Sequence, residues 1–325
     1  MRVLVTGATG MLGRGTAAAL LARGADVTVL QRRPSGLACR ELLADVADTG
    51  TVRRAAAGQD AVVHLAAKVD VVGPWSEFAH ANVDGTRSVV AACRAAGVGR
   101  LVHVSTPSVA HAGRPLVGVG AEPADPVRAR GHYARSKAVA ERAALAADSP
   151  GLAVLCVRPH LVWGPGDTQL VQRIVSRARA GRLPLIGSGA ALVDTTYVDN
   201  AVAALLAAVD SVGRVHGEPL VVSNGEPRPV AEILAGLCHA AGVAGPRGRV
   251  PVRVARVAAT AVDRVWEVLD RRDTPPLTAF LVEQLSTAHW FDQRHTRAVL
   301  GWRPTVSIDE GFDRLARWFS DRADP

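Results

Sequence analysis

The chain has 325 residues, 48% of them hydrophobic, which is enough for one large α/β domain and a smaller second portion. Its net charge of +8 comes from arginines that are spread along the chain without aromatic clusters, which argues against a nucleic-acid-binding protein. The four cysteines form no CxxC motif and no His/Cys cluster, so we expect reduced thiols, no metal and a cytoplasmic location. Because an apolar strand follows Met1 directly and no run of ~18 apolar residues occurs, we expect neither a signal peptide nor a membrane span.

The chain opens with an apolar strand over residues 3–5 that breaks into Gly7, Gly10 and Gly13 before a helical run over residues 16–23. This order of strand, glycines and helix is typical of a dinucleotide-binding turn, in which the phosphates lie at the helix N-terminus. Gly7 would make the tight turn, Gly10 would let the backbone approach the pyrophosphate, and Gly13 would allow close packing of helix on strand. The alternative is an ordinary strand-to-helix turn.

The second strand, over residues 26–30, ends in Gln31, Arg32 and Arg33. A site specific for NAD usually carries Asp or Glu near this point to hold the ribose 2′-hydroxyl. Here an uncharged side chain is followed by two guanidiniums that can bind a 2′-phosphate through charge-assisted hydrogen bonds. We therefore predict a preference for NADPH, the alternative being two solvated loop arginines.

Strand and helix continue to alternate. Residues 42–46 are expected to end a third strand, where Asp45 could meet the adenine edge, and residues 60–65 form a fourth. The small Ala66 and Ala67 after it would let a cofactor lie against the backbone. Lys68 is either a cofactor or substrate contact or an exposed loop lysine. A long helix is expected over residues 76–97, with Asn82 as a buried polar tie to the sheet.

The segment from Gly131 to Arg142 places Tyr133 and Lys137 four residues apart in an alanine-rich helical run, so both side chains lie on one face. A phenol with an ordinary pKa near ~10 needs a neighbouring positive charge if it is to exchange a proton at neutral pH. Chance is a poor explanation for the pair, because the chain has only two tyrosines and, besides Lys137, only Lys68 as a lysine. A surface tyrosine beside a surface lysine remains the alternative.

A fifth strand over residues 100–105 ends in Ser105 and Thr106, before Pro107. Ligands bind at the carboxyl ends of strands in open parallel sheets, so a hydroxyl there is placed to hold a substrate carbonyl. A plain Ser-Thr-Pro turn is the alternative for this pair considered alone. A sixth strand over residues 153–157 precedes a stiff Pro/Gly loop that reaches residue 167.

The distal part mixes helical runs with short strands such as residues 220–222. Stretches over residues 252–269 and 277–285 have helical spacing, and most such stripes are core. Some of these residues, with Trp75, Trp163 and Trp290, are candidates for an apolar pocket. We expect residues 1–167 to form the dinucleotide-binding domain and residues 168–325 mainly the substrate-binding portion, with residues 193–222 returning to the first domain.

The motifs TGATGMLG, HLAAK, NVDGT, STPSV, YARSK and RPHLVWGPGD, in this order, resemble an extended short-chain dehydrogenase/reductase of the 3β-hydroxysteroid dehydrogenase branch. The segments STPSVAHAG, LVDTTYVDNAV, VSNGEP and PLTAFLVEQLSTAHW resemble the OleD-type 2-alkyl-3-oxoalkanoate reductases of olefin and β-lactone biosynthesis. The resemblance covers nearly the whole chain. It implies an α/β fold, a doubly wound parallel sheet of Rossmann type with a smaller C-terminal portion.

Carried over by position, the resemblance implies that Tyr133 is the catalytic acid/base, Lys137 its partner and a ribose ligand, and Thr106 the group that orients the carbonyl. Pro159 would flank the nicotinamide. The full set of expected cofactor contacts is Gly7, Thr9, Gly10, Met11, Leu12, Gly13, Arg32, Arg33, Asp45, Val46, Ala66, Ala67, Lys68, Tyr133, Lys137, Pro159 and Leu161.

The resulting hypothesis is an NADPH-dependent reductase that converts the 3-keto group of a long-chain 2-alkyl-3-oxoalkanoate to the 3-hydroxy acid. The resemblance also suggests a homodimer and other enzymes of the same pathway as partners. A 3β-hydroxysteroid or sterol dehydrogenase is the main alternative, because likeness of fold does not determine a substrate. A sugar-nucleotide epimerase or dehydratase is less favoured, since Val193 stands where such enzymes usually place an arginine for the diphosphate. A dinucleotide sensor without activity would not need Thr106, Tyr133 and Lys137 together.

Overall fold

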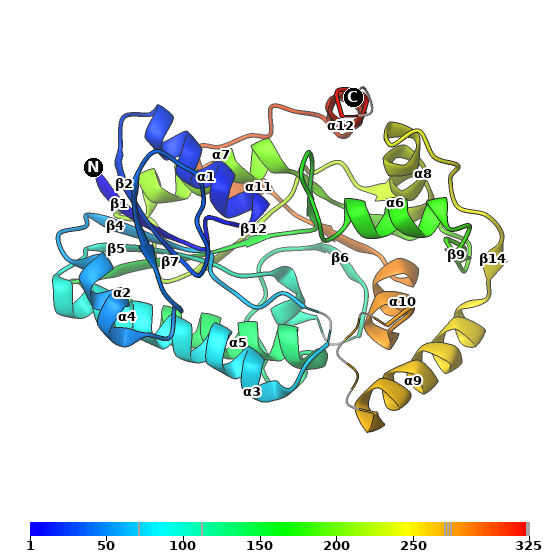
Figure 1. Cartoon of the computed structure of the whole chain (residues 1–325), viewed down its shortest axis with the longest axis horizontal. Helices are drawn as coiled ribbons and strands as arrows, with labels where there is room; N and C mark the ends of the chain where they lie inside the picture. Colours follow the sequence, from blue (N-terminus) through cyan, green and yellow to red (C-terminus); the bar gives the residue numbers. More distant parts are fainter. Residues whose placement is uncertain (71, 112, 270, 272, 274, 323–325) are drawn as a thin grey trace.

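A seven-stranded parallel sheet forms the centre of the computed structural model, which describes residues 1–70, 72–111, 113–269, 271, 273 and 275–322 (Figure 1). Its strand order is β12-β7-β5-β4-β1-β2-β3. The strands are β1 (Arg2–Thr6), β2 (Asp26–Gln31), β3 (Arg40–Leu43), β4 (Ala61–His64), β5 (Arg100–Val104), β7 (Ala153–Pro159) and β12 (Pro219–Val222). Since the order reverses between β1 and β4, the carboxyl edge there is the ligand-binding position of a doubly wound sheet.

Helices cover both faces of the sheet, which confirms the predicted fold class (Figure 1). Alternate residues of β1 supply the two cores: Val3 and Val5 face one layer and Leu4 faces the other, all fully buried. Each such side chain contributes roughly 1.5–3 kcal/mol by burial. The first layer contains α1 (Met11–Ala22), α7 (Val198–Ser211) and α11 (Arg294–Leu300), and the second contains α2 (Thr49–Ala56), α4 (Gly85–Ala96) and α5 (Gly131–Leu145).

The long helix expected over residues 76–97 is present, with an irregular middle. It runs as α3 (Trp75–Phe78), the π-helical segment η1 (Ala79–Asp84) and α4, and Gly97 ends it in the left-handed conformation at φ 66°. Asn82 lies in the π-helical segment and is buried. Its side-chain amide binds the backbone of Lys68 and the Ser136 hydroxyl, so the polar tie joins the helix to α5 and to the loop after β4.

The distal part forms a second, mainly helical layer beside the carboxyl edge of the sheet (Figure 1). Its helices are α6 (Val171–Arg179), α8 (Val230–Ala240), α9 (Val252–Val268), α10 (Ala279–Ser286) and α12 (Ile308–Ser320). A small sheet of order β13-β10-β15-β6 accompanies them, with β6 (Leu116–Val119), β10 (Leu192–Val193), β13 (Arg228–Pro229) and β15 (His289–Phe291). Two strand pairs complete it: β8 (Val162–Trp163) with β11 (Thr196–Tyr197), and β9 (Leu185–Ile186) with β14 (Arg249–Val250).

The structure corrects three sequence-based expectations about strands. Strand β6 was not expected. It forms because its residues pair with those of β15, which are distant in the sequence. Strand β3 ends at Leu43, so Asp45 and Val46 lie beyond it. Strand β7 continues to Pro159, two residues past the predicted end, because Pro159 pairs with Val222 of β12.

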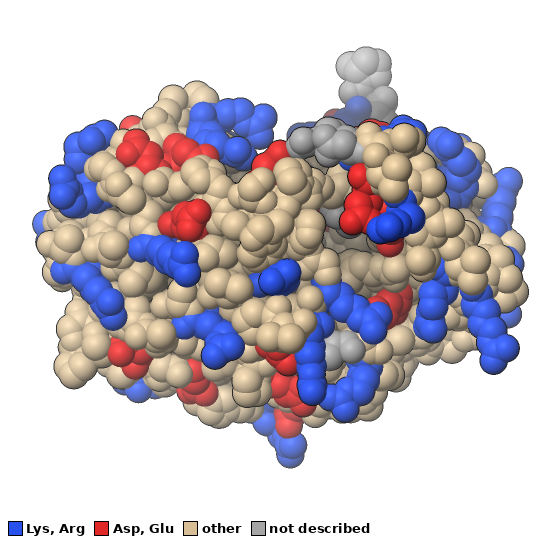
Figure 2. Space-filling model, turned by 90° about the horizontal axis from the view of Figure 1, so that it is seen from below, with Lys and Arg blue, Asp and Glu red and all other residues tan. Residues whose placement is uncertain are grey.

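Positive side chains lie across the whole width of the face seen in Figure 2, with Asp and Glu side chains between them. Among the described residues, no helix has the length and the apolar character needed to cross a bilayer.

Candidate active site

The turn between β1 and α1 has the geometry of a dinucleotide cradle. Gly7 has φ +81°, and a Cβ there would lie 2.7 Å from the amide nitrogen of Ala66, so only glycine fits. A Cβ on Gly13 would collide with the Gly7 carbonyl oxygen, whereas one on Gly10 would meet nothing closer than 3.8 Å. No side chain of the described residues caps the N-terminus of α1 at Gly10. The first-turn amides of α1 are therefore available to a pyrophosphate.

The neighbouring expected contacts surround this turn. Thr9 is exposed at the turn, and Met11 and Leu12 are half-buried in the first turn of α1. Ala66 and Ala67 are half-buried just beyond β4, where the Ala66 amide donates to the Thr6 hydroxyl at 3.2 Å. Small side chains thus line the space between the ends of β1 and β4, as a bound dinucleotide requires.

The end of β2 holds a carboxylate that sequence reasoning missed. Glu41 of β3 accepts hydrogen bonds from Gln31 Nε2 at 2.6 Å and from the Ser35 amide and hydroxyl at 2.8 Å each. The Ser35 amide is the main cause of a lowered pKa at Glu41. Glu41 thereby anchors the loop that carries Arg32 and Arg33, whose side chains are exposed and have no hydrogen-bond partner among the described residues.

Three residues that were expected to contact the cofactor, Asp45, Val46 and Lys68, contact other groups of the protein. Asp45 Oδ1 accepts from the Ala47 amide at 2.9 Å, and Val46 is buried against Gly85 in the core. The Lys68 ammonium lies 2.6 Å from Asp70 and 3.1 Å from Glu77. Lys68 is therefore held in an ion-pair cluster rather than extended as a free loop lysine.

The structure brings Thr106 to Tyr133. Tyr133 and Lys137 lie one turn apart in α5, and Thr106 immediately follows β5 as the N-cap of the 3₁₀ helix η2 (Pro107–Ala110). The Thr106 hydroxyl hydrogen-bonds to the Tyr133 side chain and lies 3.0 Å from Ser108 Oγ, a second hydroxyl that sequence reasoning missed. Ser105, by contrast, is buried, and its hydroxyl has no partner among the described residues.

Burial determines the protonation states of Tyr133 and Lys137. Burial raises the pKa of Tyr133 to about 12, and the hydrogen bond with Thr106 acts in the opposite direction. Burial lowers the pKa of Lys137 to about 8, against the opposing influence of Glu141. At neutral pH the phenol therefore keeps its proton and the ammonium keeps its charge. Burial, followed by the charge of Lys137, lowers the pKa of the nearby His64 to about 3, so this imidazole stays neutral.

Hydrogen bonds hold the pair in place. Lys137 is only 3% exposed, and its ammonium donates to the Val104 carbonyl at 2.6 Å, which ties α5 to the end of β5. Ser136 Oγ donates to the Tyr133 carbonyl at 2.8 Å and accepts from Asn82. One turn beyond Lys137, Glu141 forms a buried ion pair with Arg158 of β7, with Nε to Oε2 at 2.9 Å. These contacts hold the face of α5 that carries Tyr133 and Lys137 against β5 and β7.

The last two expected cofactor contacts lie at the end of β7 and in the loop that follows it. Pro159 is the final residue of β7 and is buried. Leu161, two residues on, has φ 42°, and it is the one described non-glycine residue with positive φ. Such a conformation costs energy, and it is often retained at functional sites.

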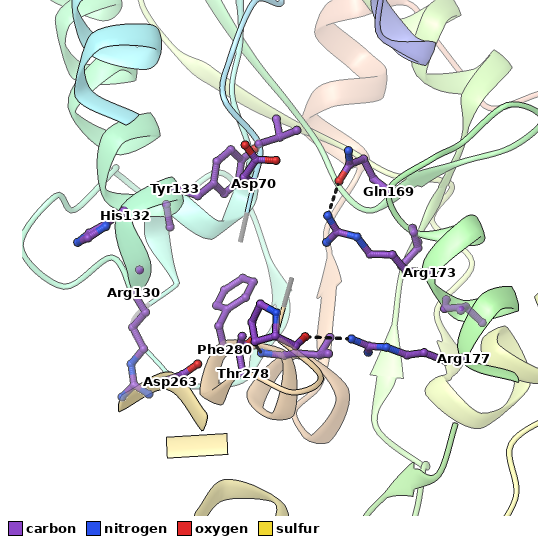
Figure 3. A pocket seen from close by; sticks show the side chains of 17 residues that line it. Asp70, Arg130, His132, Tyr133, Gln169, Arg173, Arg177, Asp263, Thr278 and Phe280 are labelled. Atoms are coloured by element: carbon purple, nitrogen blue, oxygen red, sulfur yellow. Dashed lines mark hydrogen bonds between the residues drawn. The ribbon is translucent and has the colours of Figure 1, made fainter. Parts of the chain in front are cut away.

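A cavity of about 510 Å³ opens beside Tyr133, between α5, α6 and α10 (Figure 3). Most of its wall is apolar, although three arginines of the described part of the chain reach it. It is lined by Val69, Asp70, Arg130, Gly131, His132, Tyr133, Ala134, Gln169, Leu170, Arg173, Ile174, Arg177, Asp263, Pro275, Thr278, Phe280 and Leu281.

The tryptophans proposed for the pocket are absent from this lining. Trp163 is fully buried and stacks on Phe312 with ring centroids 4.9 Å apart, so it belongs to the core. Trp75 packs edge-on to His132, and Trp290 lies against Gly118 on the small sheet. Tryptophan alone did not indicate which side chains face a ligand.

Comparison with known proteins identifies the family. Residues 3–223 match the NAD dependent epimerase/dehydratase family. The chain belongs to this family. It is a family of extended short-chain dehydrogenases/reductases, so the chain is an NAD(P)-dependent oxidoreductase with a nicotinamide cofactor.

Among members of this family, a 2-alkyl-3-oxoalkanoate reductase from Stenotrophomonas maltophilia (strain K279a) is 41% identical over 324 residues, 97% of this chain and 98% of the relative. The human sterol-4-alpha-carboxylate 3-dehydrogenase, decarboxylating, is 28% identical over 98% of this chain and 88% of its own. The solved structure of MoeE5 in complex with UDP-glucose and NAD superimposes with a TM-score of 0.77, at 24% identity, over the whole of both chains. The match to the 2-alkyl-3-oxoalkanoate reductase supports a keto reductase role for this member of the epimerase/dehydratase family.

Proposed function

We propose that the protein uses NADPH to reduce the 3-keto group of a long-chain 2-alkyl-3-oxoalkanoate to the 3-hydroxy acid. The observation that carries this proposal is the position of the Tyr133 hydroxyl, which is hydrogen-bonded to Thr106 at the edge of a largely apolar cavity. Such a cavity suits alkyl chains, whose burial contributes about 0.8 kcal/mol per methylene.

The glycine turn and the uncapped N-terminus of α1 fit a dinucleotide. When bound, NADPH supplies a hydride for the carbonyl carbon. The chain's own residues do the rest of the chemistry. Thr106 and Tyr133 hold the carbonyl oxygen, and Tyr133 transfers its hydroxyl proton to that oxygen as the C=O double bond becomes C–OH. The charge of Lys137 then stabilises the phenolate that remains, until a solvent proton replaces the one transferred.

The names of the two relatives support the substrate class. A 2-alkyl-3-oxoalkanoate and a sterol-4-carboxylate oxidised at carbon 3 share one feature: a carboxylate on the carbon next to the reacting carbon. A sugar nucleotide is less well supported, because Val193 is a buried, uncharged residue of β10 and cannot bind a diphosphate. Arg32 and Arg33 are exposed just after β2 and form no ion pair with any residue that the structure describes, which supports NADPH over NADH.

The deciding experiment measures NADPH consumption with a 2-alkyl-3-oxo acid, a 3-keto steroid and a UDP-sugar in parallel. The expected result is the highest kcat/KM for the 3-oxo acid. A clearly higher kcat/KM for the steroid would replace this proposal with a sterol dehydrogenase.

Several other statements remain predictions from the sequence. They are the homodimer, the cytoplasmic location, the pathway partners, the role in olefin or β-lactone biosynthesis and the domain division at residue 167.

A further inference from the structure

Three guanidiniums of the described residues reach the cavity, and they differ in their hydrogen-bond partners. Arg130 donates to the Glu283 carboxylate at 2.8 Å, so its charge is matched. Arg173 donates to the amide oxygen of Gln169 at 2.9 Å, and Arg177 donates to the Pro275 carbonyl at 3.5 Å. Both of these acceptors are uncharged. Within the part of the chain that the structure describes, neither Arg173 nor Arg177 forms an ion pair.

Neither of the two described carboxylates that line the cavity forms an ion pair with Arg173 or Arg177. Asp70 pairs with Lys68, and Asp263 of α9 accepts from the Ala279 amide at the start of α10 at 2.9 Å. Arg173 and Arg177 lie one turn apart on α6, so they place two like charges on one wall. Burial, and then the charge of Arg173, lower the pKa of Arg177. The two like charges repel each other, and the burial of Arg177 disfavours its charged form. An anion bound at this wall would offset both effects.

Arg173 has the better position for an anion that reacts at Tyr133. Figure 3 shows its side chain extending from α6 into the cavity, toward the side on which Tyr133 lies, whereas Arg177 lies beside the segment that carries Thr278. In a 3-oxo acid a single carbon separates the carboxyl carbon from the keto carbon. A carboxylate ligand must therefore share one cavity with Tyr133, while the alkyl chains lie along apolar wall residues such as Ile174 and Phe280.

We propose that Arg173 binds the carboxylate of the substrate, with Arg177 as a second positive charge at the same wall, and that this contact selects 3-oxo acids over neutral ketones. The inference rests on the proposed function and deepens it, because it names the group that recognises the acid. Arg173 suits this role since a guanidinium forms two parallel charge-assisted hydrogen bonds with one carboxylate.

The test compares a charged and a neutral form of one substrate. Because 3-oxo acids lose carbon dioxide readily, the assay runs in the oxidative direction, with a 2-alkyl-3-hydroxyalkanoate, its methyl ester and NADP⁺. Wild type should prefer the acid. Arg173→Met should lower kcat/KM for the acid about 10- to 100-fold, mainly through KM, and leave the ester within about twofold. Arg173→Lys, which keeps the charge without the fork, should recover part of the loss.

The matched control is Arg179→Met, because Arg179 is exposed on the same helix and does not line the cavity. This control should behave as wild type, and unfolding midpoints of all variants should agree. If Arg173→Met keeps the wild-type ratio of acid to ester, or if wild type shows no preference for the acid, Arg173 does not bind the carboxylate although the reductase function stands. If wild type oxidises neither compound, the proposed function fails and the carboxylate site falls with it.

Discussion

Lys137→Met should make the protein more stable while it removes activity. The Lys137 ammonium is charged at neutral pH although its side chain is only 3% exposed, and burial lowers its pKa from 10.5 to about 8. A shift of this size corresponds to about 3 kcal/mol of destabilisation at pH 7. Methionine has a similar length and no charge to desolvate. Allowing about 1 kcal/mol for the lost hydrogen bond to the Val104 carbonyl, we expect a net gain of about 2 kcal/mol.

The dependence on pH gives the sharper test. Between pH 8 and about 10.5, an unfolded lysine holds its proton while the native Lys137 has lost it, so the unfolded state binds more protons and stability rises with pH. From pH 7.5 to pH 9.5, wild type should therefore gain about 2 kcal/mol relative to Lys137→Met. Measurements stop at pH 9.5 because the pKa of Tyr133, raised by burial to about 12, contributes with the opposite sign above pH 10.

Urea unfolding at the two pH values, followed by circular dichroism, measures this difference. The control is Lys68→Met, which removes the chain's other lysine. Burial lowers the pKa of Lys68, but the hydrogen bonds to Asp70 and Glu77 raise it by more than burial lowers it. The net shift is upward, so Lys68 does not titrate in this pH range. If Lys137→Met shows the same pH dependence as wild type, the ammonium is not desolvated in the native state and the reasoning is wrong.

Three further predictions concern activity. Tyr133→Phe should lower kcat by about 100- to 10,000-fold while cofactor affinity, measured by fluorescence titration, stays unchanged, and a near wild-type kcat would exclude Tyr133 as the acid. Arg32→Ala should raise KM for NADPH about 10- to 100-fold and leave KM for NADH unchanged, whereas equal use of both cofactors by wild type would show that the arginines do not read the phosphate. Across a series of 3-oxo acids, kcat/KM should rise up to severalfold per methylene until the cavity is full, and a flat series would contradict the acyl-chain hypothesis.

Local chemistry made much of the molecule predictable from sequence. Gly7 and Gly13 indicate a turn that other residues cannot form, because a Cβ at either position would clash with neighbouring backbone atoms. The alternation of apolar strands and helices indicated an α/β domain, the family resemblance implied a doubly wound sheet, and the spacing of Tyr133 and Lys137 placed both in one helix, which is α5. Each of these signals acts within one turn, strand or helix, so the order of residues is enough to reveal it.

Contacts between distant segments required the tertiary structure. Nothing near Tyr133 in the sequence shows that the cavity beside it is completed by Arg173 and Phe280, or that Glu41 of β3 anchors the loop after β2. Pairing across the fold also created β6, which is too short to stand out by its own pattern. Motifs and patterns in the order of residues were enough to predict the fold class and a Tyr/Lys pair near a dinucleotide site. The packing of α6 and α10 beside Tyr133 sets which charged and apolar groups line the cavity, because side chains converge there from elements that no local periodicity connects.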